Sequence, residues 1–154
     1  MSNNISNTDG TIDSRDVIER LEELTAERDA AQDHFDECTE TYSFHNSAGT
    51  EDGPEWEDYK TARDELNAWL SENGDEYVTL QSLAEQGERY ASDWNYGEQL
   101  IRDSYFESAM DEMVADCYEL PKDLPSWMIV TYDYDALRQD YTEIDFDGVA
   151  YLIR

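Results

Sequence analysis

The chain contains few basic residues. Only 10 lysines and arginines stand against 39 aspartates and glutamates, so its 154 residues carry a formal net charge of −29. A protein that binds DNA or RNA directly needs lysines and arginines to neutralise phosphates, and this composition argues against such binding. The same negative field repels anionic membranes and attracts basic protein surfaces.

Cysteines and long apolar runs are also scarce. Cys38 and Cys117 are too few for a disulfide framework and suggest reduced thiols. No apolar run approaches the length of a membrane-spanning helix. The first residues, Met1-Ser2-Asn3-Asn4, do not begin a basic-then-apolar signal segment. We therefore expect a cytoplasmic protein.

Aromatic residues are plentiful for so acidic a chain. It has 11 Tyr, 4 Trp and 4 Phe, whereas disordered acidic segments have few aromatics. We expect an ordered fold of the mainly α (α+β) class, with long N-terminal helices followed by a small unit of one helix and a β-hairpin. The expected parts are a flexible tail over residues 1–12, an acidic helical region over 13–92 and an α+β domain over 93–154.

The helical region is predicted from apolar residues at steps of three and four. The first helix covers about Ser14 to Tyr42 with Asp13 as its cap, and we expect its apolar stripe to pack within the chain. A loop at 43–54 precedes a second helix over about 55–71, which Asn73-Gly74 ends. A third helix runs from an Asp75 cap to about 92, and a fourth covers about 98–118. The stripe of the first helix contains Val17, Leu21, Leu24, Arg28, Ala31, Phe35, Cys38 and Tyr42.

The last part of the chain changes character. A proline-bounded loop leads to Trp127-Met128-Ile129-Val130, after which Asp133 is expected to cap a short helix ending near Gln139. Residues 141–146 and 149–154 are β-prone runs separated by Asp147-Gly148, a strong signal for a two-residue hairpin turn.

Motifs for catalysis or cofactor binding are missing. The chain has no glycine-rich phosphate loop, no nucleophile elbow and no paired C-x-x-C. His34 and Cys38 have the spacing of two zinc ligands on a helix, but a zinc site needs three or four. Residues 143–148 resemble the start of a calcium loop, yet Arg154 occupies the position of the bidentate glutamate. We expect no enzyme activity, no metal and no cofactor.

The magnitude of the charge suggests a specific use. Duplex DNA carries one charge per about 1.7 Å of axis, so 29 charges correspond to about 50 Å of duplex. The first helix alone carries ten carboxylates and three arginines, only about one net charge per 6 Å, so several helices would have to contribute. The carboxylates that we expect to imitate DNA phosphates are Glu19, Glu22, Asp29, Asp33, Asp36, Glu55, Asp58, Glu65, Asp103, Asp111, Asp133, Asp135 and Asp140.

High acidity has a second explanation. Proteins adapted to high salt are acidic too, and two lysines against eight arginines fit that habit. An acidic regulatory or structural module of a mobile element is therefore the alternative function. Composition alone leaves the two explanations nearly even.

The C-terminal residues favour the first explanation. Residues from about 94 to 154 resemble the C-terminal part of the ArdA family of antirestriction proteins, which phages, plasmids and transposons encode. The shared features include Tyr105-Phe106, Leu120-Pro121 and the closing Phe146-Asp147-Gly148-Val149-Ala150-Tyr151. The residues that match the antirestriction motif of that family are Pro125, Tyr132, Asp133, Tyr134, Ala136 and Asp140.

The resemblance implies a non-enzymatic DNA mimic. Members of the family are acidic and often dimeric, which allows a homodimer here, and they occupy the DNA groove of type I restriction–modification enzymes. The first 90 residues of this chain depart from the family pattern, so a CRISPR complex or another basic host defence factor fits as well. The resemblance places the protein in the host cytoplasm if a phage encodes it.

Overall fold

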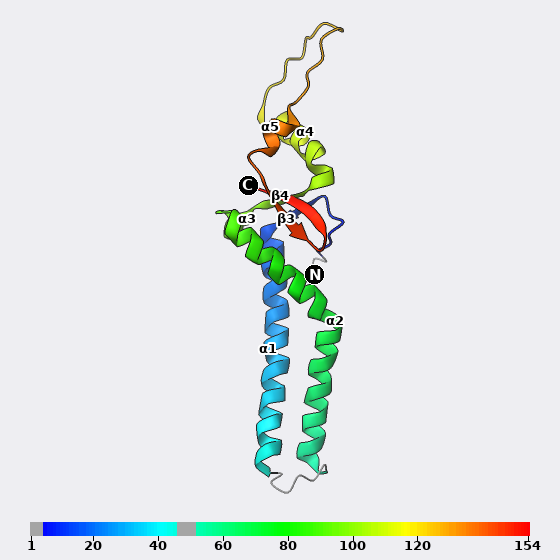
Figure 1. The fold of residues 1–154 in the computed structure, drawn as a ribbon, viewed down its shortest axis with the longest axis vertical. Coiled ribbons are helices and arrows are strands. Elements are labelled where there is room, and N and C mark those ends of the chain that lie inside the picture. Colours follow the sequence, from blue (N-terminus) through cyan, green and yellow to red (C-terminus); the bar gives the residue numbers. More distant parts are fainter. Residues whose placement is uncertain (1–4, 46–51) are drawn as a thin grey trace. The chain divides into compact units, whose positions relative to one another are not determined.

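The computed structural model describes residues 5–45 and 52–154, which divide into two compact units (Figure 1). The helical hairpin is the unit Glu19–Gln81, and the sheet unit consists of Met1–Ile18 and Ser82–Arg154. Two long helices, α1 (Ser14–His45) and α2 (Pro54–Tyr90), contribute to both units. The boundaries between units therefore fall at residues 18/19 and 81/82, and not at the expected 12/13 and 92/93.

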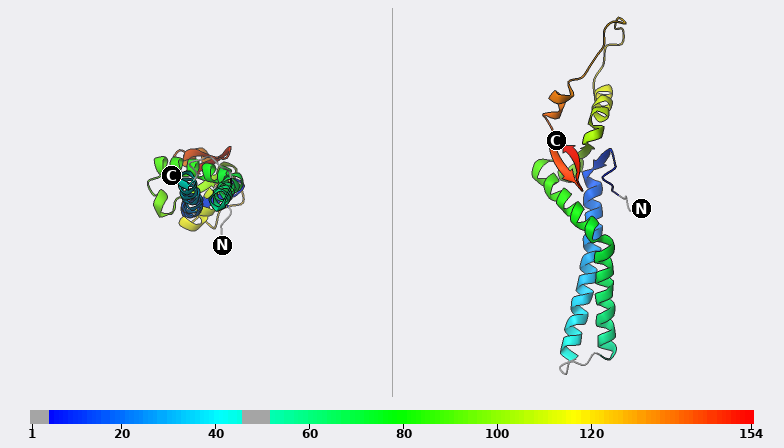
Figure 2. Two further views of the ribbon diagram at one scale, coloured as in Figure 1. Left: turned by 90° about the horizontal axis from the view of Figure 1, so that it is seen from below. Right: turned by 45° about the vertical axis from the view of Figure 1, so that its right-hand side comes forward.

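The helical hairpin is built from two antiparallel helices (Figure 2). The predicted stripe of α1 is confirmed as its inner side, since Leu24 is fully buried and Leu21, Phe35 and Tyr42 are half-buried. On α2, Ala62, Leu66 and Leu80 are buried in turn. Burial of one apolar stripe on each helix stabilises the pair.

Aromatic rings pack together in the hairpin where α1 ends and α2 begins. The centre of the Tyr42 ring lies 5.3 Å from the centre of the Trp56 ring and 5.4 Å from that of Tyr59. The ring centres of Phe35 and Tyr59 are 5.6 Å apart. The ammonium of Lys60 lies 5.5 Å from the centre of the Trp56 ring. Aromatic pairs at such distances add stabilisation beyond the area that they bury.

The prediction of two helices over residues 55–92 was wrong, because α2 continues without a break through Asn73-Gly74. A glycine inside a helix costs about 1 kcal/mol relative to alanine, which packing of the flanking turns can outweigh. Arg20 joins the two helices next to this point, since its Nε and Nη2 donate to the carboxylate of Glu76 at 2.8 and 3.0 Å. Asp75 is accordingly a residue within α2 and not a cap.

The sheet unit contains a four-stranded antiparallel sheet of order β1-β2-β4-β3. Its strands are β1 (Thr11–Asp13), β2 (Gln99–Arg102), β3 (Thr142–Phe146) and β4 (Val149–Ile153). The expected hairpin is confirmed as β3 and β4, whose turn residues Asp147 and Gly148 have φ of 50° and 77°. Two positive φ values in succession are the conformation that an Asp-Gly turn provides.

Two expectations about the sheet unit were wrong. Part of the predicted flexible tail forms β1, where Thr11 pairs with Ile101 and Ile12 is buried; residues 1–4 of that tail lie outside the described residues. The predicted helix over 98–118 begins only at α4 (Phe106–Cys117), after β2 and the 3-10 turn η1 (Asp103–Tyr105). Leu100 and Ile101 are buried in the sheet, and pairing on both sides of β2 overrides the helical spacing of the apolar residues.

A buried contact within the sheet unit holds the start of α1 beside α3 (Trp94–Gly97). The hydroxyl of Ser14 donates to the carbonyl of Trp94 at 2.6 Å and accepts from the amide of Glu98 at 2.7 Å. The predicted cap of α1 is confirmed, because Asp13 Oδ1 accepts from the amide of Arg15 at 2.9 Å. The bond to Asp13 satisfies an amide that the start of α1 would otherwise leave without a partner.

The final expected helix is confirmed as α5 (Tyr134–Arg138), where the carboxylate of Asp133 accepts from the amide of Ala136 at 3.0 Å. The expected fold class, mainly α with a smaller β part, is confirmed. Residues 46–51 of the predicted loop at 43–54 lie outside the described residues, and the prediction was wrong for residues 43–45 and Pro54, which belong to α1 and α2.

Candidate acidic interaction surface

A stripe of carboxylates runs along the exposed side of α1. Six acidic residues recur at steps of three and four over residues 19–40, with Ala26 as the single interruption, and each is exposed. The spacing keeps them on one side of the helix for about 32 Å. We call them the acidic stripe: Glu19, Glu22, Asp29, Asp33, Asp36 and Glu40.

The acidic stripe follows from the same heptad pattern that forms the packed side of α1. Glu19, Asp33 and Glu40 stand two positions, or 200° around the helix, after members of the apolar stripe (the seam). The other three acids stand one position, or 100°, after other members of it. Because the seam packs within the hairpin, the acidic stripe faces solvent. The sequence interpretation had identified five of the six residues but had missed Glu40, which the heptad spacing of the other acids could have revealed.

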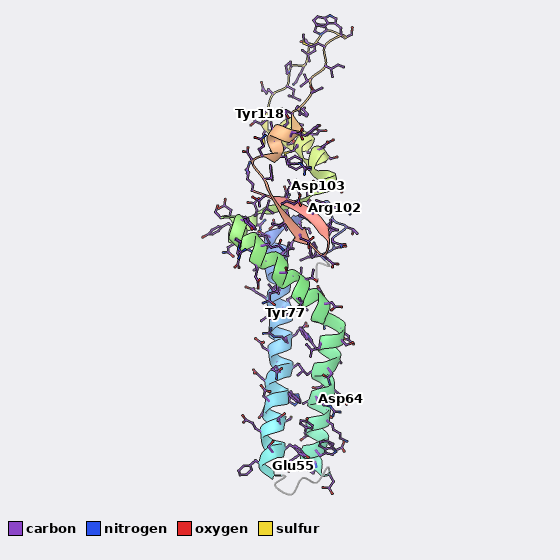
Figure 3. The ribbon with its side chains drawn as sticks, viewed as in Figure 1. Glu55, Asp64, Tyr77, Arg102, Asp103 and Tyr118 are labelled. Atoms are coloured by element: carbon purple, nitrogen blue, oxygen red, sulfur yellow. The ribbon has the colours of Figure 1, made fainter. Side chains whose placement is uncertain are left out.

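The second helix adds further carboxylates. Exposed acids on α2 include Glu57, Asp58, Asp64 and Glu65, while Glu55 is half-buried. Figure 3 labels Glu55 and Asp64, as well as Tyr77, which lies between the two helices. The hydroxyl of Tyr77 accepts from Arg28 Nη1 at 2.5 Å, so the one polar residue in the seam of α1 has a partner inside the hairpin.

Basic residues neutralise only part of this charge. The helical hairpin has 19 acidic and four basic residues, a net charge of −15. The guanidinium of Arg20 binds Glu76 and Glu23, which raises the pKa of Arg20, and Lys60 binds Glu57 at 2.8 Å. Among the described residues, no basic side chain forms an ion pair with six of the eight predicted carboxylates of the hairpin: Glu19, Glu22, Asp33, Asp36, Glu55 and Asp58.

The charge density of the hairpin approaches that of DNA. Its segment of α1, Glu19–His45, is about 40 Å long at 1.5 Å per residue. Fifteen net charges over that length are about one per 2.7 Å, compared with one per about 1.7 Å for duplex DNA. The two paired helices thus have more than twice the net charge per unit length that α1 has alone.

The structure distributes the thirteen predicted carboxylates over both units. Eight belong to the helical hairpin, and all of these except Glu55 are exposed. The five in the sheet unit are Asp103, Asp111, Asp133, Asp135 and Asp140.

Three of the sheet-unit carboxylates bind neighbouring groups in their own unit. Asp103 forms an ion pair with Arg138, whose guanidinium also lies 5.0 Å from the centre of the Phe106 ring. Asp133 is the cap of α5. The carboxylate of Asp111 accepts from the phenol of Tyr134 at 2.6 Å, and this hydrogen bond raises the pKa of Tyr134 to about 12. These contacts stabilise the fold. Asp103 is half-buried, and the other four carboxylates of this unit are exposed.

The potential zinc pair is part of a shallow hollow on the hairpin. His34, Cys38, Glu55 and Asp58 are among the residues that line it, and His34 Nδ1 lies 3.3 Å from the carboxylate of Glu65. Partial burial raises the pKa of the Cys38 thiol, and the negative charge of Asp58 adds to this effect. Within residues 5–45 and 52–154, no group of three or more His, Cys, Asp and Glu side chains is placed to hold a metal ion.

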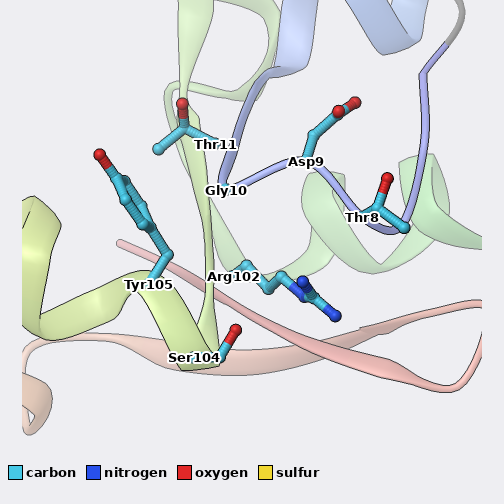
Figure 4. A pocket seen from close by; sticks show the side chains of 7 residues that line it. All are labelled: Thr8, Asp9, Gly10, Thr11, Arg102, Ser104 and Tyr105. Atoms are coloured by element: carbon cyan, nitrogen blue, oxygen red, sulfur yellow. The ribbon is translucent and has the colours of Figure 1, made fainter.

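A second hollow, of about 500 Å³, lies beside β1 and β2 in the sheet unit (Figure 4). Arg102, Ser104 and Tyr105 line it together with residues 8–11. Its single guanidinium faces a segment that also carries the carboxylate of Asp9. The hollow therefore combines opposite charges and has no marked preference for an anion.

Comparisons with protein families, with curated proteins and with solved structures find no match for this chain. The resemblance of residues 94–154 to ArdA proteins therefore stays a prediction. No helix in the described part of the chain combines the length and the apolar character needed to cross a membrane.

Proposed function

We propose that the protein is a non-enzymatic DNA mimic that occupies the DNA-binding groove of a basic defence protein, either a restriction–modification enzyme or a CRISPR complex. One observation carries this proposal. The helical hairpin presents a net charge of −15 over about 40 Å, with most of its carboxylates exposed.

A basic groove suits this surface for two reasons. Lysines and arginines that bind phosphates can bind exposed carboxylates in the same way, through charge-assisted hydrogen bonds. Much of the affinity of a groove for DNA is electrostatic and independent of sequence, so a mimic does not need to reproduce base edges. The ArdA resemblance supports the same class of target.

Competition with DNA tests the proposal. The purified protein is titrated into complexes of a labelled 20-base-pair duplex with type I restriction–modification methyltransferases and with CRISPR surveillance complexes. We expect displacement of the duplex from at least one of them, with an inhibition constant that weakens steeply from 50 to 200 mM salt. If the protein displaces DNA from none of these complexes at 50 mM salt, the proposal is contradicted.

A matched pair of variants locates the effect. The hairpin variant replaces Glu19, Glu22, Asp33, Asp36 and Asp58 with the corresponding amides. The control variant makes the same number of changes at exposed acids of the sheet unit: Glu88, Asp93, Glu107, Asp116 and Glu143. Both have the same net charge, so a much larger loss of competition in the hairpin variant supports a mimic surface on the hairpin.

Single changes such as Glu22→Gln should have little effect, since one exposed ion pair is worth about 0–1 kcal/mol. Loss of all inhibition on one such change, with the fold preserved by circular dichroism, contradicts a distributed surface. Equal losses in the hairpin and control variants would show that only total charge matters.

A further inference from the structure

An extended loop leaves the body of the sheet unit between α4 and α5, and we call residues 118–132 the arm. Figures 1 and 2 show its two limbs running out together and returning to α5. Within the arm, one backbone hydrogen bond joins the amide of Met128 to the carbonyl of Pro125 at 2.9 Å. The chain thus reverses direction at a hydrogen-bonded turn near the tip of the arm. The two limbs do not pair as β-strands.

The returning limb of the arm exposes a run of large apolar side chains. Trp127 and Ile129 are 77% and 82% exposed, while Met128 and Val130 are 44% and 43% exposed. Exposure therefore alternates with a period of two residues, as it does in an extended chain that turns one side outward. Trp127 and Ile129 form the outward side.

This exposure needs a reason. Single exposed apolar residues are ordinary, but a contiguous apolar run on a soluble protein marks an interaction site. Other large apolar side chains that are exposed in the described residues, such as Leu70, Val78 and Tyr96, are not adjacent in sequence, whereas the arm exposes four in succession. The segment also has no proline and no charge from Trp127 to Tyr132, a composition that favours association once it is exposed.

The charges beside the run indicate what can cover it. Residues 119–135 carry four acids, Glu119, Asp123, Asp133 and Asp135, against one base, Lys122. A second copy of the chain would bring the same acidic groups together, and an anionic membrane surface would repel them. A basic protein surface with an apolar pocket complements both the run and its flanks.

We propose that Trp127 and Ile129 form an apolar anchor that enters a pocket bordered by basic residues. This pocket belongs to the same DNA-binding protein whose DNA groove the hairpin occupies. This inference rests on the proposed function and adds a second contact to it. The carboxylates speed association through long-range attraction, whereas a buried aromatic anchor slows dissociation. Such an anchor would let the protein hold its target under salt conditions that weaken charge contacts.

The experiment uses the full-length chain with both Trp127 and Ile129 replaced by serine. The control has the same replacement at two exposed tyrosines of the sheet unit, Tyr90 and Tyr96, which are 50% and 82% exposed. Both variants and the wild type are measured in the DNA competition assay and by surface plasmon resonance against the methyltransferase or CRISPR complex that the wild type inhibits.

We expect the arm variant to inhibit at least about tenfold less well, as loss of a buried anchor typically does. The dissociation rate should rise, while the association rate and its salt dependence stay as in the wild type. The control variant should resemble the wild type. Circular dichroism and thermal melting check that each variant folds.

The outcomes separate this inference from the proposed function. If the wild type displaces DNA but the arm variant displaces it equally well, the anchor is refuted and the mimic stands. If the wild type displaces DNA from none of the complexes, both fall. If the wild type has twice the 17.9 kDa chain mass by light scattering and the arm variant is monomeric, a second copy covers the arm and the anchor is refuted.

Discussion

At the scale of single residues, close packing at Gly87 determines how α2 meets α3. A Cβ atom at this position would lie 2.2 Å from two carbons of the Trp94 ring, far inside van der Waals contact. Trp94 is 1% exposed, so its ring has little room to move. Glycine is therefore required here by the approach of an aromatic ring, within the buried part of the sheet unit.

We predict that Gly87→Ala destabilises the protein by about 1–3 kcal/mol, the usual range for overpacking a filled core. The measurement is urea unfolding followed by far-ultraviolet circular dichroism. Tryptophan emission should change as well, because Trp94 has to shift. A free energy of unfolding equal to that of the wild type would contradict the tight packing at this contact.

A second residue-scale prediction concerns the phenol of Tyr134. Its hydrogen bond to Asp111 raises its pKa from the ordinary 10 to about 12. Because the folded state prefers the protonated phenol, the stabilisation from this bond is present below pH 10 and is lost as the pH rises from 10 to 12.

The matched variant is Asp111→Asn, which keeps the shape of the side chain but removes the negative charge. We expect the pKa of Tyr134 to fall toward 10, visible in the tyrosinate absorbance difference between wild type and variant across pH 9–12. Tyr134→Phe removes the same titration and identifies the signal. Identical titration curves for the wild type and Asp111→Asn would refute the bond.

At the scale of elements, the continuity of α2 is the main difference from the sequence interpretation. Asn73-Gly74 is a common helix-ending pair, yet the helix runs from Pro54 to Tyr90. An added Cβ at Gly74 would meet nothing within 4 Å. The glycine is thus tolerated within the helix, and no close approach requires it.

We predict that Gly74→Ala stabilises the protein by about 1 kcal/mol, since alanine is the better helix former and restricts the unfolded chain. Gly148→Ala is the contrasting change. Its φ of 77° is unfavourable for alanine, and the loss should be about 1 kcal/mol. Urea unfolding measures both, and destabilisation by Gly74→Ala would indicate that the helix is broken at this residue.

At the scale of the whole molecule, repulsion among carboxylates opposes folding. A net charge of −29 on 154 residues raises the free energy of the compact state. Salt screens such repulsion, with a Debye length of about 30 Å at 0.01 M and about 10 Å at 0.1 M.

We therefore predict a melting temperature that rises by several degrees from 0.01 to 0.1 M sodium chloride, because about 1 kcal/mol corresponds to 2–4 °C at this size. The hairpin variant with five neutralised carboxylates should melt higher at 0.01 M and gain less from salt. Equal salt gains in variant and wild type would contradict the repulsion. A steep further rise into molar salt, without any DNA competition, would favour the salt-adapted module.

Local sequence patterns predicted the elements that depend on neighbouring residues. The cap at Asp13, the stripe of α1, the cap at Asp133 and the Asp147-Gly148 turn each involve groups within a few residues of one another. For the candidate site, the same holds for the acidic stripe, which follows from heptad spacing along α1. Such local patterns can be recognised in the sequence whatever the helix or strand packs against in the fold.

Partners distant in sequence could not be predicted in this way. The apolar spacing of Leu100 and Ile101 suits a helix, but these residues form β2 because β1 and β4 pair with it on either side. Three residues of β1 are too few for a visible alternation. The mutual placement of α1 and α2, which doubles the charge density of the hairpin, also depends on contacts between residues such as Arg20 and Glu76.

The sequence by itself determined the excess of carboxylates, the helical periodicity and the fold class, because composition and local spacing are properties of the chain alone. Only the tertiary structure decided that the acidic stripe faces solvent, that Asp103 and Asp111 bind neighbouring side chains, and that Trp127 and Ile129 are exposed. Exposure and pairing depend on which side of each element is covered, and that is settled by packing between segments far apart in the chain.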